Sequence, residues 1–209
     1  MTHINKNRET YDILASEYEQ KSEVRNEYNK MIIEKVFTKH IEKWKKILDI
    51  GCSVGVDINI LRENWYIVQG TDISQEMINY SQIRNPSVEH VCWNFLDIEF
   101  WKFDWIFAQA FIHLFPEEEV IKILDKMKSI LNEDWVAYIT TTKSEIPKEW
   151  WDEKKDYKWL HKRYRRHWTK AELTEMLERF FSIKEYYEIE DPYGKMFMIF
   201  IVVNDKKKY

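Results

Sequence analysis

The chain has 209 residues, of which 44% are hydrophobic and 33% charged, and its formal net charge is −4. This length suits one domain with a sizeable core, residues 1–209, and the apolar fraction excludes a wholly disordered chain. No apolar run reaches the roughly 18 residues that a membrane helix needs, and the N-terminus lacks a signal-peptide core. We therefore expect a soluble cytoplasmic protein with no membrane partner.

Charge and cysteine content exclude several classes of function. The two cysteines, Cys52 and Cys92, cannot build a disulfide framework, and their spacing matches no zinc site, so no metal is expected. The acidic net charge argues against a nucleic-acid partner. Positive charge does gather between Lys154 and Lys170. This run is either a solvated helical face or a cationic lid over an anionic substrate.

The predicted elements begin with a helical cap, 1–43, because residues 8–43 carry apolar positions at helical spacing. Strand and helix signals then alternate. The expected strands are Ile47–Ile50, Tyr66–Thr71, Val88–Cys92, Phe103–Ala108 and Val136–Thr142, and the helices between them are Asp57–Glu63, Gln75–Ile83 and Glu117–Leu131. This alternation predicts a doubly wound, Rossmann-like α/β fold with a parallel sheet and helices on both faces.

The pattern changes after the fifth strand. Residues 147–168 are polar, aromatic and basic, and we expect a lid or insertion there. A helix over Lys170–Phe180 follows, and the strands Ile183–Ile189 and Lys195–Val203 are joined by a hairpin turn. The complete prediction is a seven-stranded, mostly parallel sheet with a C-terminal antiparallel hairpin.

The tryptophan content is unusual, with 10 Trp against only 4 Gly. Trp65 follows a helix end where a left-handed residue, usually glycine, is expected, and Trp135 stands in an expected turn. The other suspected positions are Trp44, Trp93, Trp101 and Trp105. One hypothesis is that these are glycine positions at which a stop-type codon is read as Trp. The alternative is a naturally Trp-rich surface, and the codons of the gene decide between the two.

The loop Gly51–Gly55, at the end of the first strand, is the most informative segment for function. Ligands of doubly wound sheets bind outside the carboxyl ends of the strands. Gly51 lets the backbone approach a ligand closely, and Asp49 can accept a hydrogen bond from a cationic group. Asp72 ends the second strand, 21 residues after Gly51, and is placed to bind both hydroxyls of a ribose.

Three interpretations of this loop compete. A dinucleotide site requires glycine where Ser53 and Val56 stand. A nucleophile elbow with Ser53 as the nucleophile of a serine hydrolase fits the letters G-x-S-x-G, but no earlier strand-loop exists to supply the oxyanion donor. An adenosine-type ligand without a pyrophosphate fits best.

At this point the sequence resembles the class I S-adenosylmethionine-dependent methyltransferases, particularly the small-molecule type. The resemblance extends over nearly the whole chain. It rests on the segments Tyr11–Tyr18, Leu48–Gly55, Thr71–Ser74, Phe103–Asp104, Phe111–His113, Leu131–Trp135 and Trp168–Leu173. The family also prefers glycine at positions 44, 65, 93 and 135, which supports the codon hypothesis.

The resemblance implies S-adenosyl-L-methionine as the cofactor and assigns roles to matching positions. Asp49, Gly51 and Gly55 would line its methionine end, with Ala108 and Gln109 beneath the amino-acid part. Asp72 would bind the ribose, Ile73 would pack against the adenine, and Asn94 and Phe95 would lie at the adenine edge. Cys52, Ser53 and Met77 complete the expected cofactor site.

The acceptor is expected to be a small molecule, anionic or aromatic. His113, just beyond the fourth strand, is the first candidate for a general base. The residues expected to form the substrate site or its lid are Tyr11, Tyr18, Arg163, Arg165, Arg166 and His167. The alternative is a non-catalytic or impaired cofactor-binding protein in which Trp93 crowds the pocket.

Overall fold

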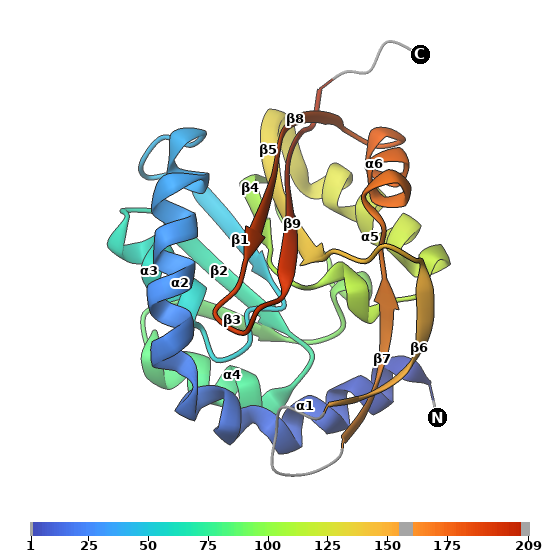
Figure 1. Cartoon of the computed structure of the whole chain (residues 1–209). Helices are drawn as coiled ribbons and strands as arrows, with labels where there is room; N and C mark the ends of the chain where they lie inside the picture. The colour runs from blue at the N-terminus through green and yellow to red at the C-terminus, as the bar shows by residue number, and fades with distance from the viewer. Residues whose placement is uncertain (1, 155–160, 206–209) are drawn as a thin grey trace.

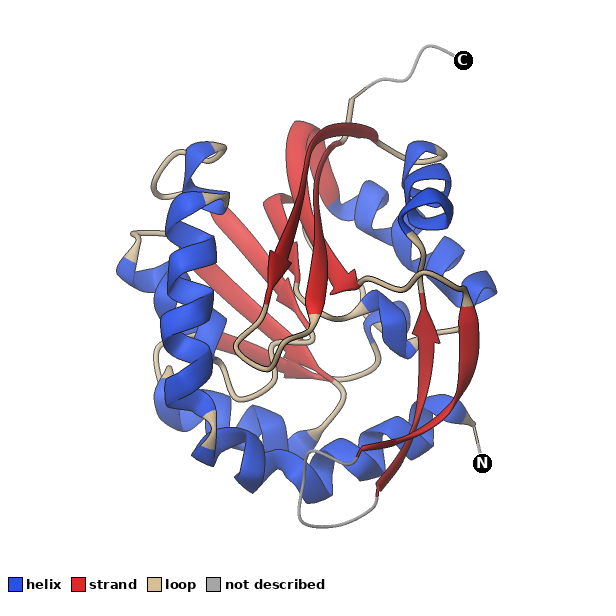
Figure 2. Cartoon of the chain, viewed as in Figure 1, coloured by secondary structure: helices blue, strands red, loops and turns tan. Residues whose placement is uncertain are grey.

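Seven strands pair into one sheet, which lies between two groups of helices (Figures 1 and 2). The computed structural model describes residues 2–154 and 161–205. The strands are β1 (Lys46–Ile50), β2 (Ile67–Asp72), β3 (Glu89–Cys92), β4 (Phe103–Ala108), β5 (Leu131–Thr142), β8 (Ser182–Glu190) and β9 (Met196–Val203), in the order β3-β2-β1-β4-β5-β9-β8. The first five pair in parallel, whereas β9 is antiparallel to β5 and β8. The predicted Rossmann-like sheet with its antiparallel hairpin is confirmed.

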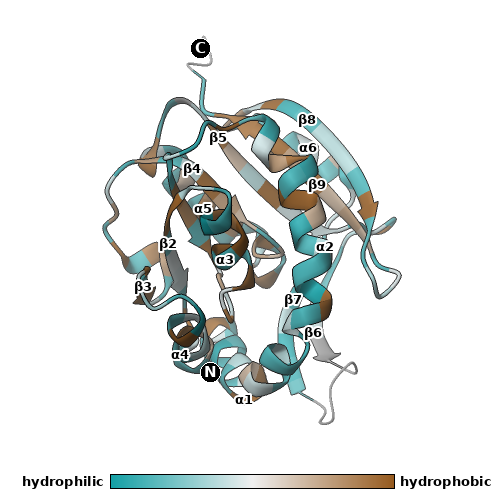
Figure 3. Cartoon of the chain, turned by 90° about the vertical axis from the view of Figure 1, so that its left-hand side faces the viewer, coloured by the Kyte–Doolittle hydropathy of each residue, from teal (hydrophilic) through white to brown (hydrophobic). Residues whose placement is uncertain are grey.

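Alternate residues of the central strands face two separate cores, as the twofold period of a strand requires. In β1, Ile47 packs into one core while Leu48 and Ile50 pack into the other. The first core includes residues of α2 (Ser22–Lys35), α3 (Val56–Glu63) and α4 (Gln75–Arg84). The second includes residues of α5 (Glu117–Ile130) and α6 (Lys170–Glu178). Figure 3 shows hydrophobic segments along β4 and β9 and a largely hydrophilic α2 in front of them.

The N-terminal cap consists of two helices rather than the continuous stretch expected over 8–43. They are α1 (His3–Gln20) and α2, followed by a short 3₁₀ turn, Phe37–Lys39. The apolar spacing continues through the bend at Lys21, so the sequence periodicity alone does not show where the first helix ends. The two helices pack against different partners: α1 against α4, and α2 against α3. None of the helices within 2–154 and 161–205 is long and apolar enough to cross a membrane.

Helix α1 lies across the carboxyl ends of the parallel strands (Figure 1). Its Asp12 carboxylate accepts a hydrogen bond from the Ser74 hydroxyl at 2.6 Å, and Glu19 pairs with Arg84 at 2.6 Å, so both contacts join α1 to α4. On the other side, the Asn7 amide oxygen accepts from Tyr164 N at 2.7 Å, and the Thr10 hydroxyl donates to Lys162 O at 2.7 Å.

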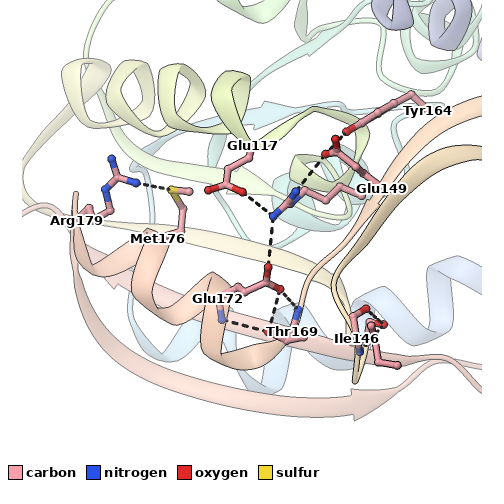
Figure 4. A network of polar contacts seen from close by, with 10 residues as sticks. Glu117, Ile146, Glu149, Tyr164, Thr169, Glu172, Met176 and Arg179 are labelled. Atoms are coloured by element: carbon pink, nitrogen blue, oxygen red, sulfur yellow. Dashed lines mark hydrogen bonds and ion pairs between the residues drawn. The ribbon is translucent and has the colours of Figure 1, made fainter.

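The predicted lid contains a two-stranded antiparallel hairpin, β6 (Lys148–Lys154) and β7 (His161–His167). Residues 155–160 of the predicted lid lie outside the described residues. Arg166 of β7 pairs with Glu117 at 2.7 Å, Glu149 at 3.1 Å and Glu172 at 3.4 Å. Figure 4 shows this network around the labelled glutamates of β6, α5 and α6. The ion pairs therefore fasten the hairpin to both helices.

Two of the six suspected tryptophans have left-handed backbones. Trp44 has φ 68° and Trp65 φ 70°, and Trp44 N donates to Trp65 O at 2.8 Å, so the two turns meet. Both side chains are exposed. A left-handed conformation costs an L-residue about 1–2 kcal/mol, which glycine avoids. The backbone thus supports the glycine hypothesis at these two positions.

The other four suspected positions do not have a positive φ. Trp93 and Trp101 are exposed. Trp105 is fully buried in β4, where its ring lies 4.5 Å from that of Phe37, and its indole N–H has no hydrogen-bond partner among the described residues. Trp135 belongs to β5, within an irregular stretch beside Phe103, instead of the expected turn.

We expect Trp44→Gly and Trp65→Gly each to raise the free energy of unfolding by about 1 kcal/mol, because relief of left-handed strain exceeds the lost surface contact and the added freedom of the unfolded chain. Chemical denaturation measures the change. Trp101→Gly is the matched control, because its side chain is 91% exposed and its φ is not positive; it should give no gain. If all three variants lost stability equally, the strain argument would be wrong.

Candidate functional site

The loop between β1 and α3 is built on two glycines. Gly51 and Gly55 have φ 75° and 77°. Gly51 N and Cys52 N both donate to Thr71 O, at 2.8 and 3.0 Å, which ties the loop to the end of β2. A Cβ on Gly55 would lie 2.2 Å from Ser81 Oγ, and a Cβ on Gly51 would lie 2.9 Å from the Phe111 ring. Neither position accepts a side chain without displacement of its neighbours.

Asp72, at the end of β2, has the geometry expected for binding a diol. Its Oδ2 accepts a hydrogen bond from Ser53 N at 3.0 Å, and its Oδ1 accepts from Ser74 N at 2.9 Å. The backbone of Ile73 also donates to the carboxylate. These bonds fix the carboxylate without filling all of its roughly four acceptor positions, so it can still accept from a ligand hydroxyl.

Three carboxylates, Asp49, Asp57 and Asp72, form what we call the acidic side of the site. Burial, followed by the charges of Asp57 and Asp72, raises the pKa of Asp49 well above its ordinary value. Burial also raises the pKa of Asp72 and raises that of Asp57 to about 6, although Asn29 Nδ2 donates to Asp57 Oδ1 at 2.6 Å. Asp49 Oδ2 is buried without a hydrogen-bond partner in the described part of the chain. Such a cluster favours a cationic ligand.

A cavity of about 600 Å³ lies next to this side, lined by the strand-end loops and by residues of α1, α2 and β7. It brings together most of the residues predicted from the sequence: Tyr11, Tyr18, Gly51, Cys52, Ser53, Asp72, Ile73, Met77, Asn94, Phe95, Gln109, His113, Arg163 and Arg165. Trp93 also lines the cavity while its side chain stays 61% exposed. It therefore forms part of the boundary and does not fill the space.

Five predicted residues do not line the cavity. Asp49 is buried among the strands, Ala108 packs into the core on the α5 side, and the carbonyl oxygen of Gly55 accepts from Asn85 Nδ2 at 2.9 Å. Arg166 belongs to the ion-pair network of Figure 4. The His167 ring lies 4.2 Å from that of Trp150.

Arg163 and Arg165 of β7, which we call the basic side, also line the cavity, as do Lys21, Arg25 and Lys195 from other elements. Arg163 Nη1 donates to the Tyr11 hydroxyl at 2.7 Å, and Arg165 Nη2 donates to the Thr142 hydroxyl at 2.5 Å. Burial raises the pKa of Tyr11 to about 12, against the opposing effect of Arg163, so Tyr11 is a neutral phenol at neutral pH. His113, only 4% exposed, lies on the 3₁₀ turn Ile112–Leu114, which packs against β7.

Sequence reasoning missed several lining residues. Asp57 stands in the first turn of α3, directly after the glycine loop. Its place next to that loop could have identified it from the sequence as a residue of the site. The remaining ones come from α2, from the end of β5 and from the β8–β9 turn, where no local motif marks them: Arg25, Tyr28, Asn29, Thr142 and Lys195.

Part of the sequence and the fold are similar to those of known methyltransferases. Residues 47–134 match the family model described as a methyltransferase domain. The matched segment contains the glycine loop and Asp72 and makes up less than half of the chain. An uncharacterized protein of Rickettsia prowazekii is 31% identical over 104 residues, which are 46% of this chain and 42% of that protein. The match thus spans less than half the length of this relative.

Three solved structures illustrate the shared methyltransferase fold. A methyltransferase from Methanosarcina mazei has a TM-score of 0.71 at 20% identity, covering 81% of this chain and 96% of its own. The 1,6-didemethyltoxoflavin-N1-methyltransferase of Burkholderia thailandensis has a TM-score of 0.70 at 16% identity, and the match covers 96% of this chain and 91% of that one. The magnesium protoporphyrin IX methyltransferase of Synechocystis has a TM-score of 0.64 at 14% identity, and the match covers 86% of this chain and 80% of that one.

The glycine loop gives a stability prediction with an internal control. Gly55→Ala should lower the free energy of unfolding by about 3 kcal/mol, from left-handed strain and overpacking against Ser81 together. Gly194→Ala shares the left-handed φ, 75°, but its Cβ would meet only Glu190 Oε1 at 3.6 Å, so about 1 kcal/mol is expected. Urea denaturation tests both, and equal losses would show that crowding at Gly55 has no effect.

The raised pKa of Asp57 predicts a pH dependence. The folded protein holds this proton up to about pH 6, whereas the unfolded chain releases it near pH 4. The folded state therefore binds more protons within that window, and its stability falls as pH rises from about 4 to about 6. Asp57→Asn should be more stable than the parent protein above pH 6, with a flatter profile between pH 4 and 6.

Denaturation midpoints of the ligand-free protein across this window provide the measurement. Glu42→Gln serves as the control, because the Glu42 side chain is 84% exposed. Identical profiles for Asp57→Asn and the parent protein would mean that Asp57 keeps an ordinary pKa.

Proposed function

We propose that this protein transfers a methyl group from S-adenosyl-L-methionine to a small-molecule acceptor that occupies the same cavity. One observation carries the proposal: a single cavity joins the acidic side at the strand ends to a separate basic side on β7. The first matches the cationic cofactor, and the second provides a distinct place for an acceptor.

The residues present fit this cofactor. It supplies a methyl group on a positively charged sulfur, which is already activated for displacement. Asp72 would bind the ribose hydroxyls, and Asp57 with the buried Asp49 would favour the positive charge of the ligand. Met77 and Phe95, both buried, add apolar surface at the expected adenine position. Asn94, whose Oδ1 accepts from Leu96 N, would lie at the adenine edge.

The main task of the protein in such a reaction is alignment of the reactants and exclusion of water. Helix α1 and β7 cover the strand ends and are joined to each other through Asn7 and Thr10, which restricts access of solvent. His113 would accept the proton that the acceptor releases, because it is the buried histidine of the cavity lining.

A small acceptor is favoured by the size and position of the cavity. A volume of about 600 Å³ falls within the range of small-molecule sites, roughly 300–1,000 Å³. The structures from Burkholderia and Synechocystis are also those of methyltransferases named for small molecules, 1,6-didemethyltoxoflavin and magnesium protoporphyrin IX. At their low sequence identity they support the type of acceptor and do not identify it.

The two alternative functions have less support. The Ser53 hydroxyl donates to Met77 Sδ at 3.3 Å, so in the described part of the chain this serine has no histidine partner of the kind that a hydrolase requires. A non-catalytic binding protein would need an obstructed acceptor site. The cavity instead extends to β7 with Trp93 at its boundary.

Titration calorimetry tests the cofactor assignment. We expect micromolar binding of S-adenosylmethionine and S-adenosylhomocysteine and no comparable binding of NAD. Asp72→Ala should weaken both at least tenfold, because it removes the acceptors for the ribose diol. No binding by the parent protein would contradict the proposal, unless Trp93→Gly restores it, which would identify Trp93 as an obstruction.

Release of S-adenosylhomocysteine in the presence of pooled small metabolites then tests catalysis. His113→Asn should keep the cofactor affinity but lower turnover by about 100-fold if it serves as the base. Binding without turnover on any acceptor would instead favour the non-catalytic alternative.

A further inference from the structure

The connection between β3 and β4, residues 93–102, carries the two residues proposed to meet the adenine, Asn94 and Phe95. It contains a short 3₁₀ turn, Phe95–Asp97, at whose start Asn94 Oδ1 accepts from Leu96 N at 3.4 Å. This contact is local. It shapes the turn but does not determine where the turn lies relative to the sheet and the cavity.

Lys126 of α5 contacts this connection from a helix 30 residues further along the chain. Its Nζ donates to the backbone oxygen of Leu96 at 2.9 Å and also to that of Ile98. An ammonium has three N–H donors, so these two carbonyls occupy most of its capacity. Burial lowers the pKa of Lys126, against the opposing charges of Glu99 and Asp97. The ammonium is therefore partly desolvated and does not behave as a freely hydrated surface cation.

The same ammonium also lies beside two aromatic rings of the connection. Its Nζ is 5.3 Å from the centroid of the Phe95 ring and 5.8 Å from that of Phe100, and a cation near the face of a ring is attracted to it. The Phe95 and Phe100 rings stack with centroids 5.7 Å apart, and the Phe111 ring meets Phe95 edge to face at 6.1 Å. Phe95, which is buried and lines the cavity, is thus held between Lys126 and Phe111.

We infer that Lys126 is a positioning residue for the cofactor: its ammonium holds the β3–β4 connection where Phe95 and Asn94 meet the adenine. The inference rests on the proposed function. Lys126 does not itself line the cavity, so it acts through the connection and not by contact with the ligand. A lysine that only joined α5 to the sheet would affect stability without acting through Phe95.

Titration calorimetry with S-adenosylhomocysteine tests the inference on Lys126→Met, which keeps the apolar stem and removes the donors and the charge. We expect binding about tenfold weaker than that of the parent protein. Lys126→Arg should recover part of the affinity, because a guanidinium restores both N–H donors and a cation near the rings. Lys122→Met is the matched control, because Lys122 lies one helical turn earlier on α5 with an exposed side chain, and it should leave the affinity unchanged.

Two double-mutant cycles locate the effect. Phe95→Leu should itself weaken binding, and Lys126→Met added to it should weaken binding by no more than about threefold, because the ring through which Lys126 acts is already lost. Added to Asp72→Ala, which removes the ribose contact, Lys126→Met should keep its full effect of about tenfold. A purely structural contact would give the full effect in both cycles.

Two results overturn the inference while the proposed function stands: equal affinity of Lys126→Met and the parent protein, or the full effect of Lys126→Met in the Phe95→Leu background. If a melting curve shows that Lys126→Met does not fold, Lys126→Gln takes its place, because it keeps N–H donors without the charge, and a loss of about threefold is expected. Absence of S-adenosylhomocysteine binding in the parent protein would overturn the proposed function and this inference together.

Discussion

The carboxylates of Asp49, Asp57 and Asp72 converge where β1, β2 and α3 meet, and much of the architecture exists to hold them there. Asp72 is fixed by two backbone N–H groups, one from the glycine loop and one from the start of α4. Asp57 is held by Asn29, which draws α2 into the site. Burial disfavours the ionised forms of these carboxylates, and under the proposed function a cationic ligand would offset that cost. The left-handed backbone at Gly51 and Gly55 makes the sharp turn that brings the three carboxylates together.

The far side of the cavity has a different construction. It does not come from the Rossmann-like sheet but from a separate hairpin, held by backbone hydrogen bonds to Asn7 and Thr10 and by the Arg166 ion pairs. Under the proposed function the sheet supplies the place for the cofactor, and the hairpin adds Arg163 and Arg165 to the lining of the same cavity. Because the hairpin is joined to α1, α5 and α6, its two inward arginines are held on a supported surface.

Much of this arrangement is predictable from sequence. The strand–helix alternation specifies the sheet, and the place of Gly51 and Asp72 at strand ends specifies the cofactor side, because both depend on local periodicity and on the geometry of parallel sheets. The left-handed turn at Trp65 follows from a helix-end signal. Trp105 does not: it sits in the middle of a strand, where its burial depends on partners distant in sequence. The inward direction of Arg163 and the outward direction of Arg166 required the register of β7, which a run of basic residues does not reveal.

Helix α1 connects the two sides of the cavity as one rod of 18 residues, about 27 Å long. Its middle and C-terminal parts are attached to α4 next to Asp72, and its N-terminal part is attached to β7, which carries Arg163 and Arg165. A ligand that orders one end of α1 therefore also orders the other end. A second ligand then binds to a helix that is already ordered and loses less conformational entropy. Under the proposed function, cofactor and acceptor should therefore bind with positive cooperativity.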